Sequence, residues 1–186
     1  MNNAIYYLDY LMSIENYPKA KLCQISLCCL IIASSNQIAK YDELDQNIPL
    51  NKDFLKMSGL MCTIDALNKC EKELLSKLEW KLKVITPLHF IDLIINSGYA
   101  FQSDLVKQGN IVSEDLYKVK NKIQLLSDLI IEYTEFLKFS PSIVGMSCII
   151  AGRKLGKIIN YWTSVFECTY SLKVNEITKC TNLFLK

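Results

Sequence analysis

The sequence has few of the residues that interrupt helices. Among its 186 residues there are only 6 glycines and 4 prolines, so tight turns should be scarce. The longest apolar run covers residues 25–33 and is broken by Ser26, far short of the roughly 20 residues that span a bilayer. We therefore expect long helices joined by a small number of turns, and no membrane partner.

The sequence also has little to support catalysis or metal binding. His89 is the single histidine and has no nucleophile and carboxylate pattern around it, so we expect a surface or half-buried helix residue. Cys62 and Cys70 are eight residues apart, and no Cys-x-x-Cys spacing of a zinc site occurs. A glycine-rich phosphate loop is missing as well. We expect a protein that is not an enzyme, with no catalytic residue, metal, cofactor or small-molecule substrate.

Arginine, the usual bidentate reader of bases and phosphates, is almost absent. Arg153 is the single arginine among 21 basic residues, and the net charge is +2. Residues 1–100 carry 10 lysines and 11 acids (net −1), and residues 101–186 carry 11 basic and 8 acidic groups (net +3). Because neither half has a clustered basic excess, we expect no nucleic-acid partner.

Cysteine, in contrast, is abundant. Several of the eight cysteines, Cys28, Cys29 and Cys148 among them, lie inside apolar helical runs, where cysteine acts as a small hydrophobic residue. The first residues, Met1–Ala4, do not resemble a signal peptide. We therefore expect a reduced intracellular protein of the nucleus or the cytoplasm, not a disulfide-linked one.

Apolar periodicity predicts an all-α protein. The predicted helices are residues 3–14, 19–36, 50–62, 64–78, 87–97, 113–137, 142–155 and 174–185, with a shorter segment at 161–170. Residues 37–49 and 101–112 are interpreted as loops, and residues 80–87 as an extended linker.

Two of the predicted helices, 19–36 and 142–155, are apolar almost all round, as is typical of a helix surrounded by others. Ile31-Ile32-Ala33 in the first recurs as Ile149-Ile150-Ala151 in the second, 118 residues later. This echo predicts two similar helical bundles in tandem, each packed around one buried helix.

Four stretches, in their order along the chain, resemble the cyclin family. Residues 4–13 (AIYYLDYLMS) are similar to the second helix of the first cyclin box, and residues 30–34 (LIIAS) to the end of its central helix. Residues 71–90, with EKELLSKLEWKL and TPLHF, resemble its fifth helix and the crossing into the second box. Residues 136–155, with FLKFSPS and AGRKL, resemble the central helix of that second box.

The resemblance implies two tandem cyclin-type helical bundles, residues 1–85 and residues 86–186, the first lacking its first helix. It implies a regulatory subunit that binds and activates a cyclin-dependent serine/threonine protein kinase in cell-cycle control. Such a partner holds the kinase's regulatory helix, so that the kinase's Lys–Glu ion pair is assembled. Residues 71–82 look most similar to D-type cyclins, and the second box to the A and B types.

The resemblance further implies a set of kinase-binding residues in the first box. They are Ile32, Ser35, Asn36, Glu71, Leu75, Trp80 and Leu82. Tryptophan is enriched at interface hot spots, which favours Trp80 as a contact. Ile32 and Leu75 fit a core equally well, and Ser35 and Asn36 fit the end of a helix.

The chain departs from the cyclin pattern in two ways. The helix that precedes residue 4 in the family is absent, so part of the central helix should be exposed. The lysine that follows "AS" in the family is Ser35 here, and Glu71, which matches its usual partner, should lack that ion pair. Glu71 is then either a kinase contact or part of a solvated helix face.

These departures leave two alternatives open. The chain is either a degenerate or truncated cyclin-fold adaptor that activates no kinase, or a TFIIB-like transcription factor with the same tandem fold. The low arginine count and the weak net charge argue against the second alternative.

Overall fold

The fold was analysed in a computed structural model, which describes residues 2–38, 50–101, 104–106, 109–110, 112–163, 166 and 174–186. The chain divides into two compact units, Met1–Val84 and Ile85–Lys186, one residue before the predicted boundary. Each unit has its own hydrophobic core. Within the described ranges, no helix is long and apolar enough to cross a membrane.

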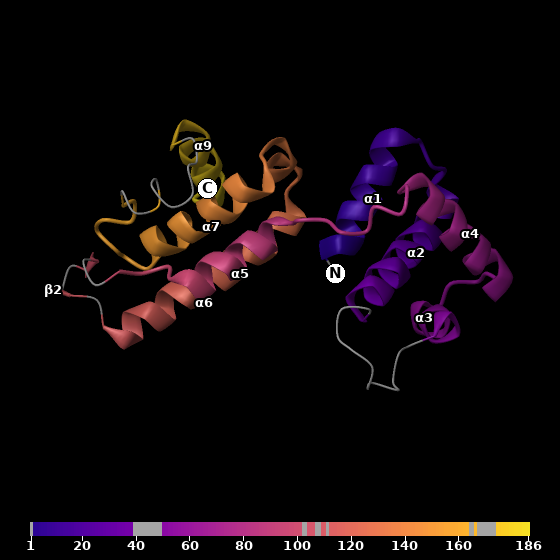
Figure 1. Cartoon of the computed structure of the whole chain (residues 1–186), viewed down its shortest axis with the longest axis horizontal. Coiled ribbons are helices and arrows are strands. Elements are labelled where there is room, and N and C mark those ends of the chain that lie inside the picture. The colour runs from indigo at the N-terminus through magenta and orange to yellow at the C-terminus, as the bar shows by residue number, and fades with distance from the viewer. Residues whose placement is uncertain are drawn as a thin grey trace. The chain divides into compact units, whose positions relative to one another are not determined.

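The first unit is built around one central helix. Its helices are α1 (Asn2–Ile14), α2 (Lys19–Ile38), α3 (Asn51–Ser58) and α4 (Ile64–Lys77). Helix α2 contacts each of the other three, as its position in Figure 1 shows. Its buried residues include Ile25, Leu27 and Ala33, which lie on different sides of the helix. The prediction of a central helix at residues 19–36 is confirmed.

One side of α2 is nevertheless exposed. Cys23, Ser26 and Leu30 follow one another at helical spacing and are all exposed, Leu30 to 38% of its surface. The prediction of a partly exposed central helix is therefore confirmed for this stripe.

The second unit repeats this plan around α7. Its elements are α5 (Pro87–Ser97), the hairpin β1 (Leu105–Val106) and β2 (Gly109–Asn110), α6 (Ser113–Glu132), the 3-10 helix η1 (Thr134–Lys138), α7 (Pro141–Leu155) and α9 (Val174–Phe184). Every residue of α7 from Ile143 to Arg153 is buried, because the helix packs against α5, α6 and α9 (Figure 1). The second predicted central helix is confirmed.

Glycine allows two of these helix contacts to be close. A Cβ atom on Gly145 would lie 2.7 Å from Cβ of Phe90 on α5. A Cβ atom on Gly152 would lie 2.4 Å from Cγ1 of Ile123 on α6. Both distances are shorter than any ordinary carbon–carbon contact, so α7 needs glycine where it touches its neighbours.

Local sequence explains where two of the helices begin. Thr63 caps α4, because its Oγ1 accepts a hydrogen bond of 3.2 Å from the N–H of Ala66. Pro87 occupies the first turn of α5. The exposed His89 closes that turn by accepting a hydrogen bond of 3.0 Å at Nδ1 from the N–H of Thr86. The lone histidine therefore acts as a cap.

Several predicted boundaries were wrong. The helix predicted at 113–137 ends at Glu132, because Tyr133 adopts an extended backbone (φ −112°, ψ 116°), and η1 follows. The helix predicted at 50–62 ends at Ser58, where Gly59 turns the chain with a left-handed φ of 65°. The region interpreted as a loop at 101–112 contains the short hairpin. Most of the helical segment predicted at 161–170 lies outside the described residues.

Candidate functional site

The end of α2 is tied to the segment that follows α4. The Nδ2 group of Asn36 donates a hydrogen bond of 2.9 Å to the backbone oxygen of Leu82. The hydroxyl of Tyr7 on α1 donates to the same oxygen at 2.6 Å, and Asn36 Nδ2 lies 3.4 Å from that hydroxyl. The structure thus brings together two of the predicted contact residues, Asn36 and Leu82, through a tyrosine that sequence reasoning missed.

Tyr7 is suited to hold this junction. Its side chain is fully buried, and burial raises the pKa of the phenol above its usual value of 10.0. The hydroxyl therefore remains a neutral donor at physiological pH. In the sequence, the apolar residues Ala4, Leu8 and Leu11 around Tyr7 indicate that it is buried. No local pattern predicts its hydrogen bond to Leu82.

Trp80 is presented on a turn with an unusual backbone. Glu79 and Trp80 have φ angles of 50° and 57°, in the left-handed region that side chains other than glycine rarely adopt. The turn is held by hydrogen bonds from the N–H of Trp80 to Leu75 O (3.1 Å) and from the N–H of Leu82 to Trp80 O (3.0 Å). Trp80 is 68% exposed, so a strained turn carries a large aromatic group into solvent.

Glu71 has a partner other than the one expected from the family. Its Oε2 accepts a hydrogen bond of 2.9 Å from Nδ2 of Asn51 at the start of α3. Asn51 Nδ2 also donates to Oδ1 of Asn68, at 2.9 Å. Glu71 is half-buried as a result, and it is not simply part of a solvated helix face. No sequence signal linked Asn51 with Glu71, which lie 20 residues apart.

The other predicted contact residues differ in exposure. Ile32 is 2% exposed and lies in the core of the first unit, so its side chain is not available at the surface in this conformation. This favours the interpretation of Ile32 as a core residue, and its role as a kinase contact stays a prediction. Leu75 and Leu82 are half-buried against the same core, and Ser35 is exposed. As kinase contacts, Ser35, Asn36, Glu71, Leu75, Trp80 and Leu82 remain predictions.

A buried ion pair in the second unit was also missed. Arg153 on α7 and Asp104 are both fully buried, and they form two parallel hydrogen bonds, Nη1 to Oδ2 at 2.7 Å and Nη2 to Oδ1 at 2.8 Å. The guanidinium also donates to the backbone oxygens of Tyr99 (2.7 Å), Asn160 (3.0 Å) and Tyr161 (2.8 Å). All five of its N–H groups are used, as a buried arginine requires.

This arrangement makes Arg153 a structural residue. Its guanidinium ties the chain before β1 to the chain after α7, and it lies 5.5 Å and 5.2 Å from the ring centres of Phe101 and Phe166. The signal that could have found it is a single arginine inside an otherwise apolar helix, since such a group needs a buried carboxylate.

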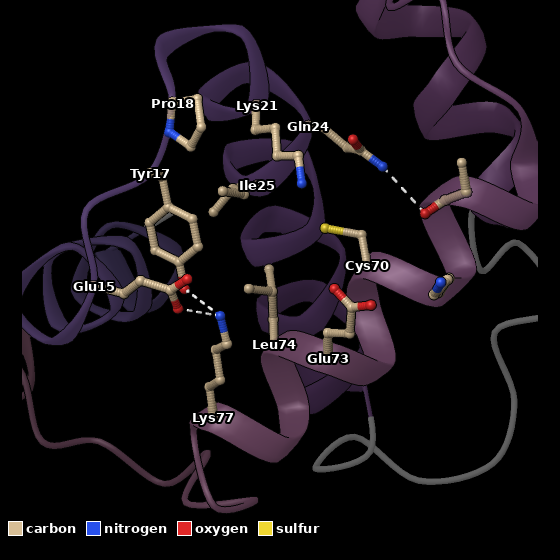
Figure 2. A pocket seen from close by; sticks show the side chains of 12 residues that line it. Glu15, Tyr17, Pro18, Lys21, Gln24, Ile25, Cys70, Glu73, Leu74 and Lys77 are labelled. Carbon is tan, nitrogen blue, oxygen red and sulfur yellow. Dashed lines mark hydrogen bonds and ion pairs between the residues drawn. The ribbon is translucent and has the colours of Figure 1, made fainter.

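A pocket of about 330 Å³ lies among the end of α1, α2 and α4 (Figure 2). Lys77 on α4 binds Glu15 across its mouth and donates a hydrogen bond of 3.2 Å to the hydroxyl of Tyr17. The ammonium of Lys77 lowers the pKa of Glu15, and Glu15 raises the pKa of Lys77. Lys77 therefore ties α4 to Glu15, the residue that directly follows α1.

The part of the chain that the structure describes offers no cluster of three or more His, Cys, Asp or Glu side chains that would hold a metal ion. The lone histidine is used at a helix start, and the lone arginine is used in the core. Among the described aromatic side chains, the indole of Trp80 is the most exposed, at 68% of its surface.

Two family models match the chain, and together they cover nearly all of it. The model of the cyclin N-terminal domain matches residues 1–83, and the model of the cyclin C-terminal domain matches residues 85–186. These matches account for the two units, each built around one buried helix.

Curated proteins similar to the chain carry cyclin names. Cyclin-D of Ostreococcus tauri is 29% identical over 81% of this chain and 40% of its own length. Cyclin-J-like protein of Mus musculus is 26% identical over 98% of this chain and 48% of its own length. Cyclin-B1-1 of Arabidopsis thaliana is 27% identical over 95% and 36%, respectively. The chain thus spans less than half the length of these relatives.

Proposed function

The chain belongs to the cyclin family, and from this membership we propose that it binds and activates a cyclin-dependent serine/threonine protein kinase in cell-cycle control. Cyclins are regulatory proteins and not catalysts, and the proposal gives this chain the same role. The proposed partner is a kinase catalytic subunit. The proposed location is the reducing environment of the nucleus or the cytoplasm.

The observation that carries this proposal is the presentation of Trp80. We define the α2–α4 face as Ser35, Asn36, Glu71, Leu75, Trp80 and Leu82. Its aromatic group, Trp80, is exposed. Hydrogen bonds from Tyr7 and Asn36 hold the backbone two residues later, at Leu82. A preorganised backbone lowers the entropy lost on binding, and tryptophan is enriched among interface hot spots.

Activation follows from holding a kinase helix in place. A protein kinase needs the ion pair between its β3 lysine and its αC glutamate before phosphoryl transfer proceeds. A partner that binds better to the conformation with this pair assembled shifts the kinase population toward it. Such a partner supplies a rigid surface and needs no chemistry of its own, which matches the character of the α2–α4 face.

The proposal is tested by measuring the affinity of the chain for a panel of purified cyclin-dependent kinases. Trp80→Ala is expected to weaken the complex by about 30-fold, since loss of a hot-spot side chain costs about 2 kcal/mol. Glu71→Lys is expected to weaken it as well, because it removes the carboxylate from the α2–α4 face and places a fourth ammonium on α4.

Tyr117→Ala is the matched control for Trp80→Ala. Tyr117 lies on α6 in the second unit and is 66% exposed, so its removal takes away a similar aromatic surface outside the proposed face. Its affinity should stay within about twofold of the unsubstituted chain. Equal affinities for the Trp80→Ala and Tyr117→Ala variants would show that the α2–α4 face is not the interface.

A second candidate function is an adaptor that binds a partner without activating a kinase. The exposed Ser35 stands where the family has a lysine, and Glu71 is bound by Asn51 in its place. A neutral amide orients the carboxylate with less electrostatic stabilisation than an ammonium would. Kinase binding without any rise in kinase activity would favour this adaptor.

A TFIIB-like role in DNA binding has less support. The single arginine of the chain is fully buried and bound to Asp104, so it is not available to contact bases or phosphates. The discriminating measurement is the affinity for duplex DNA between 50 and 200 mM salt. A steep loss of affinity over this range indicates phosphate contacts.

A further inference from the structure

Two cysteines of the first unit meet where α2 contacts α4. Cys28 on α2 is fully buried, and its Sγ lies 3.7 Å from the backbone oxygen of Leu67 on α4. Leu67 is one helical turn before Cys70, and the thiols of Cys28 and Cys70 are close enough to shift each other's pKa. The two sulfur atoms are therefore neighbours, although the residues are 42 positions apart in the sequence.

One of these thiols is open to small molecules. Cys70 is half-buried and lines the pocket of about 330 Å³ among α1, α2 and α4. Figure 2 shows its sulfur pointing from α4 into this pocket. The volume is about ten times the roughly 30 Å³ that a water molecule occupies in the liquid, so a small oxidant fits.

The surroundings make Cys70 the more acidic thiol of the two. The neighbouring thiol of Cys28 is the main cause that lowers the pKa of Cys70, with help from the ammonium groups of Lys21 and Lys77. Burial and the carboxylate of Glu73 oppose this shift without reversing it. The proximity of Cys70, together with burial, raises the pKa of Cys28. A thiolate, and not a thiol, is the attacking nucleophile in such chemistry.

We propose that Cys70 and Cys28 form a dithiol site that hydroperoxides oxidise to a disulfide between α4 and α2. In the first step the Cys70 thiolate attacks one oxygen of a hydroperoxide, the O–O bond breaks, and Cys70 becomes a sulfenic acid. For hydrogen peroxide, the departing hydroxide takes a proton and leaves as water. In the second step the Cys28 sulfur attacks the Cys70 sulfur, the S–O bond breaks, and the hydroxyl leaves with the Cys28 proton as a second water.

The second unit contains a comparable pair that lacks access. Cys180 on α9 is close enough to Cys148 on α7 to raise its pKa, and both thiols are fully buried. Burial raises the pKa of Cys180 to about 11 and also raises the pKa of Cys148. These two thiols serve as an internal control that should remain reduced.

Oxidation of the first pair would act on the helices that carry the α2–α4 face. Cys70 directly precedes Glu71, and Cys28 lies one turn before Ile32. A disulfide bond of about 2.05 Å is much shorter than a hydrogen bond between thiols, so closing it draws α4 toward α2. The site is defined by its own chemistry and does not depend on the kinase proposal.

The test maps the oxidised thiols of the whole chain. The Cys23→Ser chain, which lacks an exposed cysteine on α2, is treated with hydrogen peroxide, quenched, digested without reduction and analysed by mass spectrometry. We expect a peptide pair joined by Cys28 and Cys70, two hydrogen masses lighter than the sum of its parts, while Cys148 and Cys180 stay alkylatable. Treatment with a thiol reductant should restore both free thiols.

A matched pair of variants separates the two steps. Cys28→Ser keeps a hydrogen-bond donor beside Cys70 but cannot form the bond, so Cys70 should accumulate as a sulfenic acid that dimedone traps. Cys28→Ala removes the donor as well, and the first oxidation of Cys70 should slow by about tenfold, as expected for a thiolate that is less stabilised.

The mapping on the chain with both cysteines does not depend on whether these variants fold. The proposal is overturned if Cys70 remains a free thiol at peroxide concentrations that oxidise Cys23 in the unsubstituted chain. It is equally overturned if Cys70 pairs with the neighbouring Cys29, or if the buried Cys148 and Cys180 oxidise at the same rate as Cys28 and Cys70.

Discussion

Arg153 and Asp104 show how much a single buried residue decides in the second unit. A charge that loses its partner inside a core is strongly destabilising, by about 3–5 kcal/mol. Arg153→Met leaves Asp104 as a buried, unpaired carboxylate and also frees three backbone oxygens that the guanidinium satisfied. We expect this variant to lose most of the stability of the second unit in urea denaturation followed by circular dichroism.

Lys154→Met is the control for this experiment, because Lys154 is the next residue on α7 and is exposed. Its stability should change by less than about 0.5 kcal/mol. If Arg153→Met changes the free energy of unfolding by a similarly small amount, a methionine side chain stabilises the second unit as well as the ion pair does.

Tyr7 provides a second prediction at the scale of single residues. Tyr7→Phe removes the donor to Leu82 O while keeping the buried ring, and should cost about 1 kcal/mol. Tyr6→Phe, one position earlier on α1 and exposed, should cost almost nothing. The two free energies of unfolding at pH 8 test the difference, and equal values would contradict a role for the hydrogen bond.

The same tyrosine predicts a dependence on pH. Because burial raises the pKa of Tyr7 in the folded chain, its contribution is fully present below the unfolded value of about 10. That contribution is lost as the pH rises through the higher folded pKa, since the unfolded chain releases the proton first. The stability difference between the unsubstituted chain and Tyr7→Phe should therefore shrink above pH 10. A difference that grows with pH would contradict the burial of a neutral phenol.

Sequence reasoning found residue types better than residue partners. Trp80 and Asn36 stood out through their resemblance to a family pattern, and Cys28 was correctly interpreted as a buried residue. The partners of Glu71 and Arg153 were missed, because Asn51 lies 20 residues away on the short helix α3 and Asp104 lies 49 residues away, directly before β1. Contacts of this kind are fixed by tertiary packing, and no local pattern encodes them.

At the scale of elements, the contact of α7 with α6 depends on Gly152. A Cβ atom there would lie 2.4 Å from Ile123 Cγ1 and 3.2–3.3 Å from the Ile123 backbone, so a side-chain rotation alone cannot relieve the clash. Gly152→Ala should lower the free energy of unfolding by about 1–3 kcal/mol. The cost of the clash is larger than the gain from the higher helix propensity of alanine. The measurement is the thermal midpoint of the whole chain.

Ile123→Ala supplies the coupled test of this contact. It removes the nearest atom of the clash, so Gly152→Ala should cost less in that background than in the unsubstituted chain. An increase in thermal midpoint on Gly152→Ala alone would show that α6 and α7 do not approach as closely as described.

The beginnings of elements were easier to predict than their ends. Thr63 and Pro87 mark the starts of α4 and α5 through local chemistry that is visible in the sequence. The end of α6 at Glu132 has no such marker, because apolar residues continue through η1 to Phe136 and Leu137. The periodic pattern therefore runs on past the point where the backbone turns.

At the scale of the whole molecule, the two units are expected to fold separately. The buried core of the first unit is made only of residues up to Leu78, and the core of the second begins at Ile91. A chain of residues 85–186 should therefore unfold cooperatively, with a thermal midpoint close to that of the same unit in the whole chain. Calorimetry of the fragment and of the whole chain checks this, and a fragment that shows no transition would contradict it.

The tandem arrangement itself was predicted from the recurrence of the Ile-Ile-Ala run in the two central helices. The structure and the family models agree with that prediction, because each unit surrounds one helix with its neighbours. A recurring buried helix does not identify the binding partner. Its sequence reflects the packing inside each unit and not the exposed surface that a partner would contact.

The most direct test of the central claim is the activity of a purified cyclin-dependent kinase, measured on a serine/threonine peptide with increasing amounts of this chain. We predict that for at least one kinase of a panel the phosphorylation rate rises to a plateau. Trp80→Ala should shift the half-maximal concentration upward about 30-fold, and Tyr117→Ala should leave it unchanged. A panel in which no kinase gains activity, even where the chain binds, would contradict the account and leave the adaptor as the function to pursue.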